Sequence, residues 1–275
     1  FDHPLNRPEV DPSGRLTSGY TVLQPRVETY PARARPTLFS RIFEADRGLD
    51  LYSRAVSDVY QDLFGTGIYV GKGIYDVAAF EGTLRDRIPE NALLSHDLFE
   101  GVHGRAALAT DVTLFEDFPD QVLSYLQRLH RWVRGDWQIA RWLFSRVPSS
   151  SGEWVPNRIG ALGRWMIFDN LRRSLLFPAL LALVTVGVVF LPGPSWWWAA
   201  AALSALAVPV VLGSPMLFRL RATVSPGWAP VSRGTLLRAT GASRWLVAVV
   251  LLPYRAYLEA DAIVRTLVRV LVTKE

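Results

Sequence analysis

An uncharged stretch of 45 residues, between Arg173 and Arg219, dominates the hydrophobic pattern of this chain. A Pro-Gly-Pro turn at 192–194 divides it into two apolar runs, 174–191 and 195–212. Each run is close to the roughly 20 residues that a helix needs to cross the hydrocarbon core of a membrane. A buried helix pair in a soluble domain is the alternative, but two adjacent uncharged runs of this length favour a transmembrane hairpin.

The residues that flank the two runs indicate how such a hairpin would be oriented. Arg172 and Arg173 precede the first run, and Arg219 and Arg221 follow the second. Positive charge at both ends predicts that both ends face the cytoplasm. The three tryptophans of 196–198, next to the turn, would then form an aromatic belt in the far interface.

The C-terminal segment 245–272 has a different pattern, because charged residues such as Arg255, Glu259 and Arg269 interrupt its apolar positions. No uncharged run in it reaches spanning length. Apolar residues that alternate with charges at helical spacing predict helices lying on the membrane surface. A third span, broken at Pro253, is the alternative.

The first half of the chain shows both strand and helix signals. Residues 20–24 predict a short strand that ends at Pro25. Residues 64–73 form a glycine-rich turn. Apolar residues at helical spacing predict three helices, over 38–63, 75–84 and 119–143.

Charge also divides the chain into two parts. Residues 1–150 hold 17 basic and 20 acidic residues, whereas residues 151–275 hold 13 basic and 5 acidic residues. This distribution does not fit a nucleic-acid-binding protein, in which basic residues gather on one polar domain. It fits a cytosolic domain joined to a membrane region with a basic cytoplasmic face. We therefore expect an α/β domain over 1–150 and an α-helical membrane region over 151–275, with the linker-like Ser149–Gly152 between them.

Composition excludes several kinds of chemistry. The chain has no cysteine, so a disulfide framework, a thiol nucleophile and a cysteine zinc site are all impossible. The run from Phe64 to Gly73 misses both the spacing of a Walker A loop and that of the dinucleotide fingerprint. Its glycines predict either a tight turn or a backbone that passes close to a ligand.

Ser95-His96-Asp97 is the first candidate site. Asp97 could act as a general base, with His96 tuning it or touching a phosphate. The alternative is that Ser95 or Asp97 caps a helix that starts at Leu98. No spacing of histidines and acids in this region resembles a preformed metal site.

The segment Gln127–Gln138 is the second candidate, since it carries three arginines and two tryptophans on one predicted helix. Arg128, Arg131 and, less well, Arg134 fall near one face at three-residue spacing. Guanidinium groups suit phosphates, and an indole face suits a sugar ring. A solvated charged face with tryptophans in the core is the alternative.

These motifs together resemble the glycosyltransferase region of bacterial cyclic β-1,2-glucan synthases, which are large inner-membrane relatives of cellulose synthase. The resemblance covers nearly the whole chain and is strongest in three segments, 60–76 (YQDLFGTGIYVGKGIYD), 93–101 (LLSHDLFEG) and 129–138 (LHRWVRGDWQ). It implies an incomplete GT-A-like nucleotide-sugar transferase fold, whose missing strands would lie in an N-terminal part upstream of Phe1.

The resemblance also implies roles for individual residues. Asp97 stands where the wider group has the aspartate base of a Thr-Glu-Asp motif, and His96 precedes it. Arg131 and Trp132 match the end of the group's Gln-x-x-Arg-Trp motif, with Arg128 in the place of the glutamine. The loop that lies beside the acceptor sugar in cellulose synthase-like enzymes corresponds to Phe64, Gly65, Thr66 and Gly67.

The implied activity is processive, inverting transfer of glucose from UDP-glucose to a growing β-1,2-glucan at the bacterial inner membrane, with the transferase domain in the cytoplasm. A divalent metal, Mg or Mn, is also implied. Its Asp-x-Asp motif has no counterpart in this chain, so the ligands are expected upstream and the chain alone is expected to be inactive. The alternatives are another membrane β-glucan synthase, of the osmoregulated or cellulose type, and a non-catalytic membrane scaffold with a degenerate transferase domain.

Overall fold

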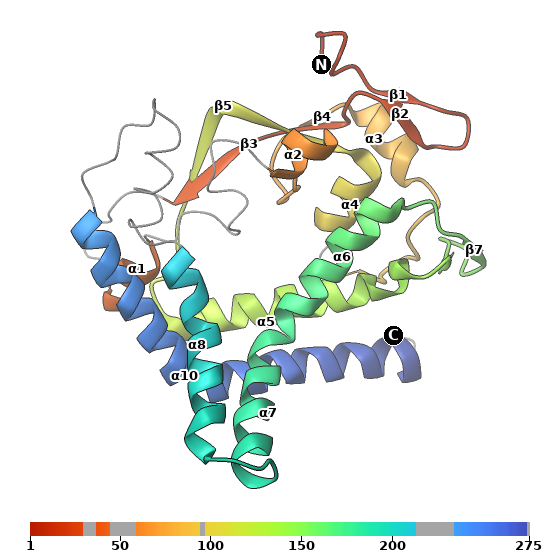
Figure 1. The fold of residues 1–275 in the computed structure, drawn as a ribbon. Coiled ribbons are helices and arrows are strands. Elements are labelled where there is room, and N and C mark those ends of the chain that lie inside the picture. The colour runs from red at the N-terminus through yellow and green to blue at the C-terminus, as the bar shows by residue number, and fades with distance from the viewer. Residues whose placement is uncertain (30–36, 45–58, 94–96, 213–233, 274–275) are drawn as a thin grey trace.

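The computed structural model describes residues 1–29, 37–44, 59–93, 97–212 and 234–273, and all structural statements refer to these. A small mixed sheet lies on one side of the molecule, and long helices form a layer beneath it (Figure 1). A helical hairpin projects from that layer on the side away from the sheet (Figure 1). The protein is thus a mixed α/β structure in which helices predominate, as the sequence predicts at that level.

The main sheet has three strands in the order β4-β3-β5, and these are β3 (Val22–Thr29), β4 (Ile74–Tyr75) and β5 (Ala106–Glu116). β3 pairs with β5 in parallel and with β4 antiparallel. The predicted end of the first strand at Pro25 is wrong, because β3 continues for four more residues. The register of the β3–β5 pair shifts between Pro25 and Arg26. The proline, which has no N–H to donate, therefore lies at an irregularity of the hydrogen-bond ladder.

Two short hairpins lie outside this sheet, and they pair β1 (Glu9–Val10) with β2 (Leu16–Ser18) and β6 (Arg146–Pro148) with β7 (Trp154–Pro156). The short helices of this part of the chain are α1 (Leu38–Glu44), α2 (Val59–Phe64), α3 (Val77–Leu84) and α4 (Asp97–Gly104). The predicted helix over 38–63 is therefore found only at its two ends, since residues 45–58 lie outside the described part. Asp76 caps α3 by accepting a hydrogen bond from the backbone N–H of Ala79 at 3.0 Å.

The predicted helix over 119–143 is confirmed as α5 (Val122–Gln138), followed by a 3₁₀ turn, η2 (Ile139–Leu143). A buried cluster joins η2 to α4 and α6 (Ala161–Ser174). Phe99 of α4 is fully buried there, with its ring centroid 4.9 Å from that of Trp142. This cluster draws residues from both sides of position 150; the division into two domains at that position stays a prediction.

Each of the two uncharged runs contains a helix, α7 (Leu176–Val189) and α8 (Ser195–Leu212). They pack closely at Gly187, where a side-chain Cβ would lie 2.4 Å from the indole of Trp198. Among the described residues, no single helix combines the length and the apolar composition needed to cross a membrane. The pair α6 and α7 meets both conditions only when joined, across a 44° bend.

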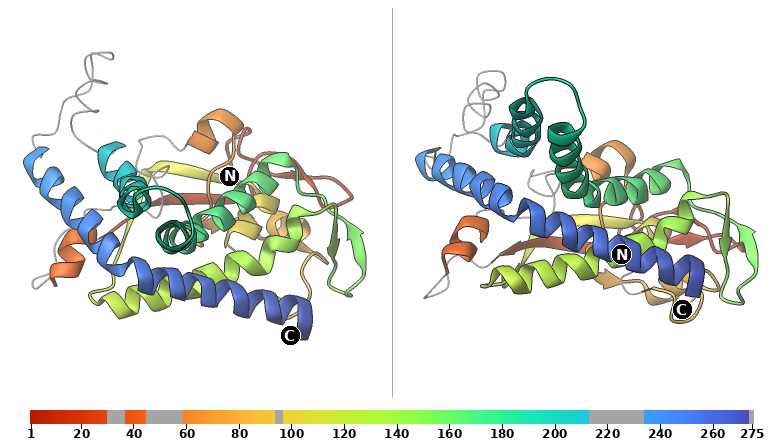
Figure 2. Two further views of the ribbon diagram at one scale, coloured as in Figure 1. Left: turned by 60° about the horizontal axis from the view of Figure 1, so that its bottom comes forward. Right: turned by 90° about the horizontal axis from the view of Figure 1, so that it is seen from below.

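The segment 245–272 is not a set of separate helices. It belongs to one helix of 35 residues, α10 (Gly234–Val268), and to the turn η3 (Arg269–Thr273) that follows. Pro253 lies inside α10 without ending it. α10 runs beneath α5 and past the base of the hairpin (Figure 2), and buries residues against both, which include Leu252, Ala256, Ala262 and Ile263.

Candidate functional site

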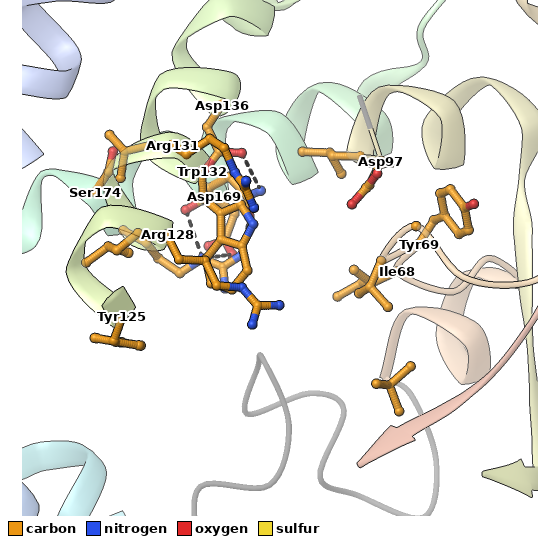
Figure 3. Close-up of a pocket in the computed structure, with 18 of the residues that line it drawn as sticks. Ile68, Tyr69, Asp97, Tyr125, Arg128, Arg131, Trp132, Asp136, Asp169 and Ser174 are labelled. Atoms are coloured by element: carbon orange, nitrogen blue, oxygen red, sulfur yellow. Dashed lines mark hydrogen bonds and ion pairs between the residues drawn. The ribbon is translucent and has the colours of Figure 1, made fainter. Parts of the chain in front are cut away.

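A cavity of about 680 Å³ lies between the loop after α2, the start of α4, the end of β5, and the helices α5, α6 and α10. Four of the residues predicted from the sequence line it, namely Asp97, Arg128, Arg131 and Trp132. Asp97 lies on one side of the cavity and the α5 residues lie on the other (Figure 3). The fold therefore brings the two strongest sequence motifs to one place, although Asp97 and Arg128 are 31 positions apart along the chain.

Asp97 is the first residue of α4, and its carboxylate rests against the backbone of Gly71. A Cβ on Gly71 would lie 2.8 Å from Oδ2 of Asp97, and the φ angle of this glycine is +79°. Both the space and the backbone conformation therefore require glycine. Phe99 anchors α4 in the core two residues later, so the position of the Asp97 carboxylate is set from both sides.

The opposite wall comes from α5. Leu126 and Val133 are buried, and Val133 packs with residues of α10. Arg128 and Trp132 lie one turn apart on the cavity side, and the Arg128 guanidinium sits 4.6 Å from the centre of the Trp132 ring. This contact holds the indole and the guanidinium in a fixed relation to each other.

Two charged residues that the sequence analysis missed complete this end of the cavity. The Lys72 ammonium contacts the Glu116 carboxylate, and the Arg128 guanidinium lies 4.0 Å from the same carboxylate. Burial lowers the pKa of Lys72, and the nearby charge of Arg128 acts in the same direction, while Asp97 opposes it. Burial also lowers the pKa of Arg128, with Arg131 contributing. Lys72 and Arg128 thus share the Glu116 carboxylate. Asp97 and Asp117 also line the cavity.

The other end of the cavity contains acids that are partly or fully buried. Asp136 of α5 accepts a hydrogen bond from the Asn170 amide at 3.2 Å. Burial raises the pKa of Asp136 to about 6, although that hydrogen bond and the charge of Arg173 act against the shift. Asp169 of α6 is nearly fully buried and pairs with Arg172, whose Nε lies 2.8 Å from Oδ1, and with Arg173.

Glu259 of α10 lies at the same end and is fully buried. Nε of Arg255 donates to Oε1 of Glu259 at 2.8 Å, while Oε2 has no hydrogen-bond partner in the part of the chain that the structure describes. Burial raises the pKa of Glu259, and Arg255 opposes the shift through its charge and its hydrogen bond. No sequence motif pointed to this residue.

The predicted acceptor loop is placed differently. Phe64, Gly65, Thr66 and Gly67 are not among the residues that line the cavity, and Phe64 is largely exposed. The five residues that follow, Ile68–Lys72, line it instead. The backbone of Gly67 pairs with Ala106 of β5, and this β-bridge fixes where the lining segment starts.

Two histidines, His96 and His103, lie near Asp97 in the sequence. His96 lies outside the described residues, so its role in tuning Asp97 or contacting a phosphate stays a prediction. His103 is held in the core, where its ring lies 4.2 Å from that of Phe99 and its Nδ1 lies 2.9 Å from the Phe99 carbonyl oxygen. Burial lowers the pKa of His103 to about 4, so this ring is neutral at physiological pH.

No group of three or more histidines and acids in the described part of the chain is arranged to hold a metal ion. The described residues therefore do not supply a site for the divalent metal that the resemblance implies, and we assign it no step.

No family model matches the chain. Its sequence is 41% identical over 280 aligned positions, which is 99% of the chain, to cyclic beta-(1,2)-glucan synthase NdvB of Rhizobium meliloti (strain 1021). The match covers 9% of the length of that protein. The chain is therefore a relative of that synthase, and it corresponds to a small part of it.

Proposed function

We propose that this chain supplies the general base and the acceptor-side wall of a glycosyltransferase that moves glucose from UDP-glucose to a growing β-1,2-glucan. The relationship to the glucan synthase supports the reaction class. The single observation that carries the proposal is the shared cavity, in which Asp97 faces a guanidinium–indole wall. A carboxylate base, cations for a diphosphate and an aromatic face for a sugar are the groups such a transfer needs.

In the proposed reaction, Asp97 takes the proton from the acceptor hydroxyl as its oxygen attacks the anomeric carbon of the donor. Attack and departure of the diphosphate occur in one displacement, which inverts an α-linked donor into a β-linked product. General-base assistance of this kind contributes about 10²–10⁴-fold to the rate. The contact with Gly71 keeps the carboxylate in place for this step.

The leaving diphosphate develops negative charge, and the cavity has cations to receive it. Arg128 and Arg131 come from α5, and Lys72 comes from the loop opposite. Because Lys72 and Arg128 are half-buried, their attraction for a phosphate is stronger than it would be on an open surface, whereas Arg131 is exposed. Trp132 presents its ring beside them as a platform for a sugar.

We further propose that the α7–α8 hairpin holds this site at the bacterial inner membrane, with Asp97 on the cytoplasmic side. The hairpin carries exposed apolar side chains around its tip, namely Val188, Val189, Phe190, Trp196 and Trp197. Exposed apolar surface of this extent is typical of a surface that meets another apolar phase. The tip lies at the end of the hairpin that points away from α5 and α6 (Figure 1), two helices that line the cavity.

The test is Asp97→Asn in the intact protein, assayed for glucose transfer from UDP-glucose and, separately, for UDP binding. Transfer should fall at least a hundredfold, while UDP affinity changes little, because the base contacts the acceptor and not the nucleotide. Glu100→Gln is the matched control, since Glu100 lies in the same helical turn but does not line the cavity.

Retention of more than a tenth of the normal transfer rate by Asp97→Asn would show that Asp97 is not the base. A wild-type protein that neither binds UDP nor transfers glucose would favour the non-catalytic scaffold. Digestion of the product with linkage-specific hydrolases separates a β-1,2-glucan from the product of another β-glucan synthase, because the linkage depends on which acceptor hydroxyl faces Asp97.

A further inference from the structure

The deep end of the cavity contains a polar group that the proposed reaction does not use. Glu259 is fully buried and lines the cavity, yet its Oε2 atom has no hydrogen-bond partner among the described residues. A buried carboxylate oxygen without a partner is unfavourable, so a native protein rarely leaves one without a ligand or a water molecule to satisfy it.

The Glu259 side chain is held in a fixed position. Arg255 bonds to its other oxygen, and the Arg255 guanidinium in turn lies 3.7 Å from the centre of the Phe177 ring of α7. Arg255 is therefore fastened between α7 and Glu259, and this arrangement leaves only Oε2 of Glu259 for a third group. That oxygen can accept a hydrogen bond from a hydroxyl or an N–H group.

Hydrogen-bonding chemistry decides which part of a substrate reaches this end. Arg173 and Arg255 also line the cavity here, but they are paired with Asp169 and Glu259. An ionised diphosphate has only acceptor oxygens and cannot donate to Oε2 of Glu259, whereas every sugar unit carries hydroxyl donors. The remaining units of an acceptor glucan, beyond the one that meets Asp97, are therefore the ligand that fits.

We propose that Glu259 binds a hydroxyl group of the acceptor glucan through its free carboxylate oxygen, one or more sugar units away from Asp97. This inference rests on the proposed function and adds an acceptor subsite to it. The glucan then passes from Asp97, over Trp132, towards the junction of α5, α6 and α10, which is where the hairpin begins.

The experiment compares Glu259→Gln with the wild type in the intact protein, using β-1,2-linked gluco-oligosaccharides of increasing length as probes. Binding is followed by tryptophan fluorescence and transfer is followed by KM and kcat. In the wild type, longer oligosaccharides should bind more tightly than the disaccharide. In Glu259→Gln the ratio of the affinity for longer oligosaccharides to that for the disaccharide should fall about tenfold. UDP affinity and kcat at saturating acceptor should stay near wild type.

Asp261→Asn is the matched control, since Asp261 is two residues further along α10 and pairs instead with His130 and Arg265. Glu259→Gln keeps the shape of the side chain and an oxygen for Arg255, so it should fold, and a thermal unfolding curve checks this.

An unchanged length dependence in a folded Glu259→Gln variant would overturn the subsite, even if the wild type transfers glucose normally. Equal loss of affinity for UDP and for all oligosaccharides would show a structural role and would also overturn it. Failure of the proposed function is a separate result, because the wild type itself would then show neither UDP binding nor transfer.

Discussion

The cavity and the α7–α8 hairpin are held together by opposite kinds of contact. Charged pairs organise the cavity, such as Lys72 with Glu116 and Arg255 with Glu259. The hairpin contains no ionisable side chain and is held by apolar residues of three helices, which are Phe177, Leu180, Ala202, Leu206, Leu252 and Ala256. The two regions meet at α10, which contributes to both.

The difference shows what each region lacks. In the cavity an oxygen of Glu259 finds no hydrogen-bond partner within the described ranges of the chain, and a polar ligand would supply one. On the hairpin, Phe190 and Trp196 are exposed to about 76% and 66%, and an apolar neighbour would cover them. Each region thus suits different surroundings, and changes in charge or in apolar area should affect one and leave the other unchanged.

A change of pH should produce the largest difference in response between the cavity and the hairpin. The pKa of Asp136 is raised from 3.8 to about 6 in the folded protein, so the folded state binds more protons than the unfolded state between about pH 4 and pH 6. Its contribution to stability is therefore lost as the pH rises through that window. The asparagine in the Asp136→Asn variant cannot titrate, so this loss disappears. The free energy of unfolding of the variant, relative to that of the wild type, should therefore rise by about 2 kcal/mol from pH 4 to pH 7, allowing for the partial exposure of Asp136.

Denaturant unfolding of the wild type and Asp136→Asn at several pH values measures this difference. Asp111→Asn serves as control, because Asp111 is exposed on β5. The hairpin has no group that titrates, so binding to neutral lipid vesicles should show no matching change across the same window. Parallel stability curves for wild type and Asp136→Asn would contradict the raised pKa.

A smaller and more local effect should follow from Gly71→Ala. The added Cβ would collide with the Asp97 carboxylate, and the positive φ angle adds backbone strain of about 1 kcal/mol. Displacement of the base should lower kcat for glucose transfer more than tenfold, since a shift of about 1 Å in a reacting group is that costly. Vesicle binding should be unaffected.

The Gly65→Ala variant separates the effect of backbone strain from the effect of displacing Asp97. Gly65 also has a positive φ angle, of +62°, but a Cβ there would meet only the Tyr20 hydroxyl, at 3.9 Å. It should therefore lose a similar amount of stability and keep most of its activity. Equal losses of kcat in the two variants would show that Asp97 is not positioned by Gly71.

The sequence predicted the helices better than the sheet. Periodic apolar residues marked α5, because one face of it is buried against its neighbours. Two long uncharged apolar runs marked α7 and α8. β5 was missed: its buried Ala106 and Ala107 are not typical strand residues, and they are buried because β3 pairs with them. Pairing between segments more than 80 residues apart leaves little trace in either segment.

The candidate site was predictable where a motif is local. Asp97, Arg131 and Trp132 lie within short recognisable segments, and the structure places them around one cavity. Lys72 and Glu259 were missed because their roles depend on partners from distant elements. One signal for Lys72 was available, since the chain has only two lysines among 30 basic residues.

The smallest expected effect concerns the tip of the hairpin. Trp196 and Trp197 are exposed to 66% and 61%, and replacing both by alanine should weaken binding to lipid vesicles about fivefold, for roughly 1 kcal/mol of lost apolar contact. UDP binding should not change, since neither residue lines the cavity. Trp154→Ala is the control, because Trp154 is also more than half exposed but lies on β7, away from the hairpin. If Trp154→Ala weakened vesicle binding as much as the hairpin variant does, an exposed tryptophan at any place on the surface would promote vesicle binding. The distinction between the hairpin and the rest of the molecule would then fail.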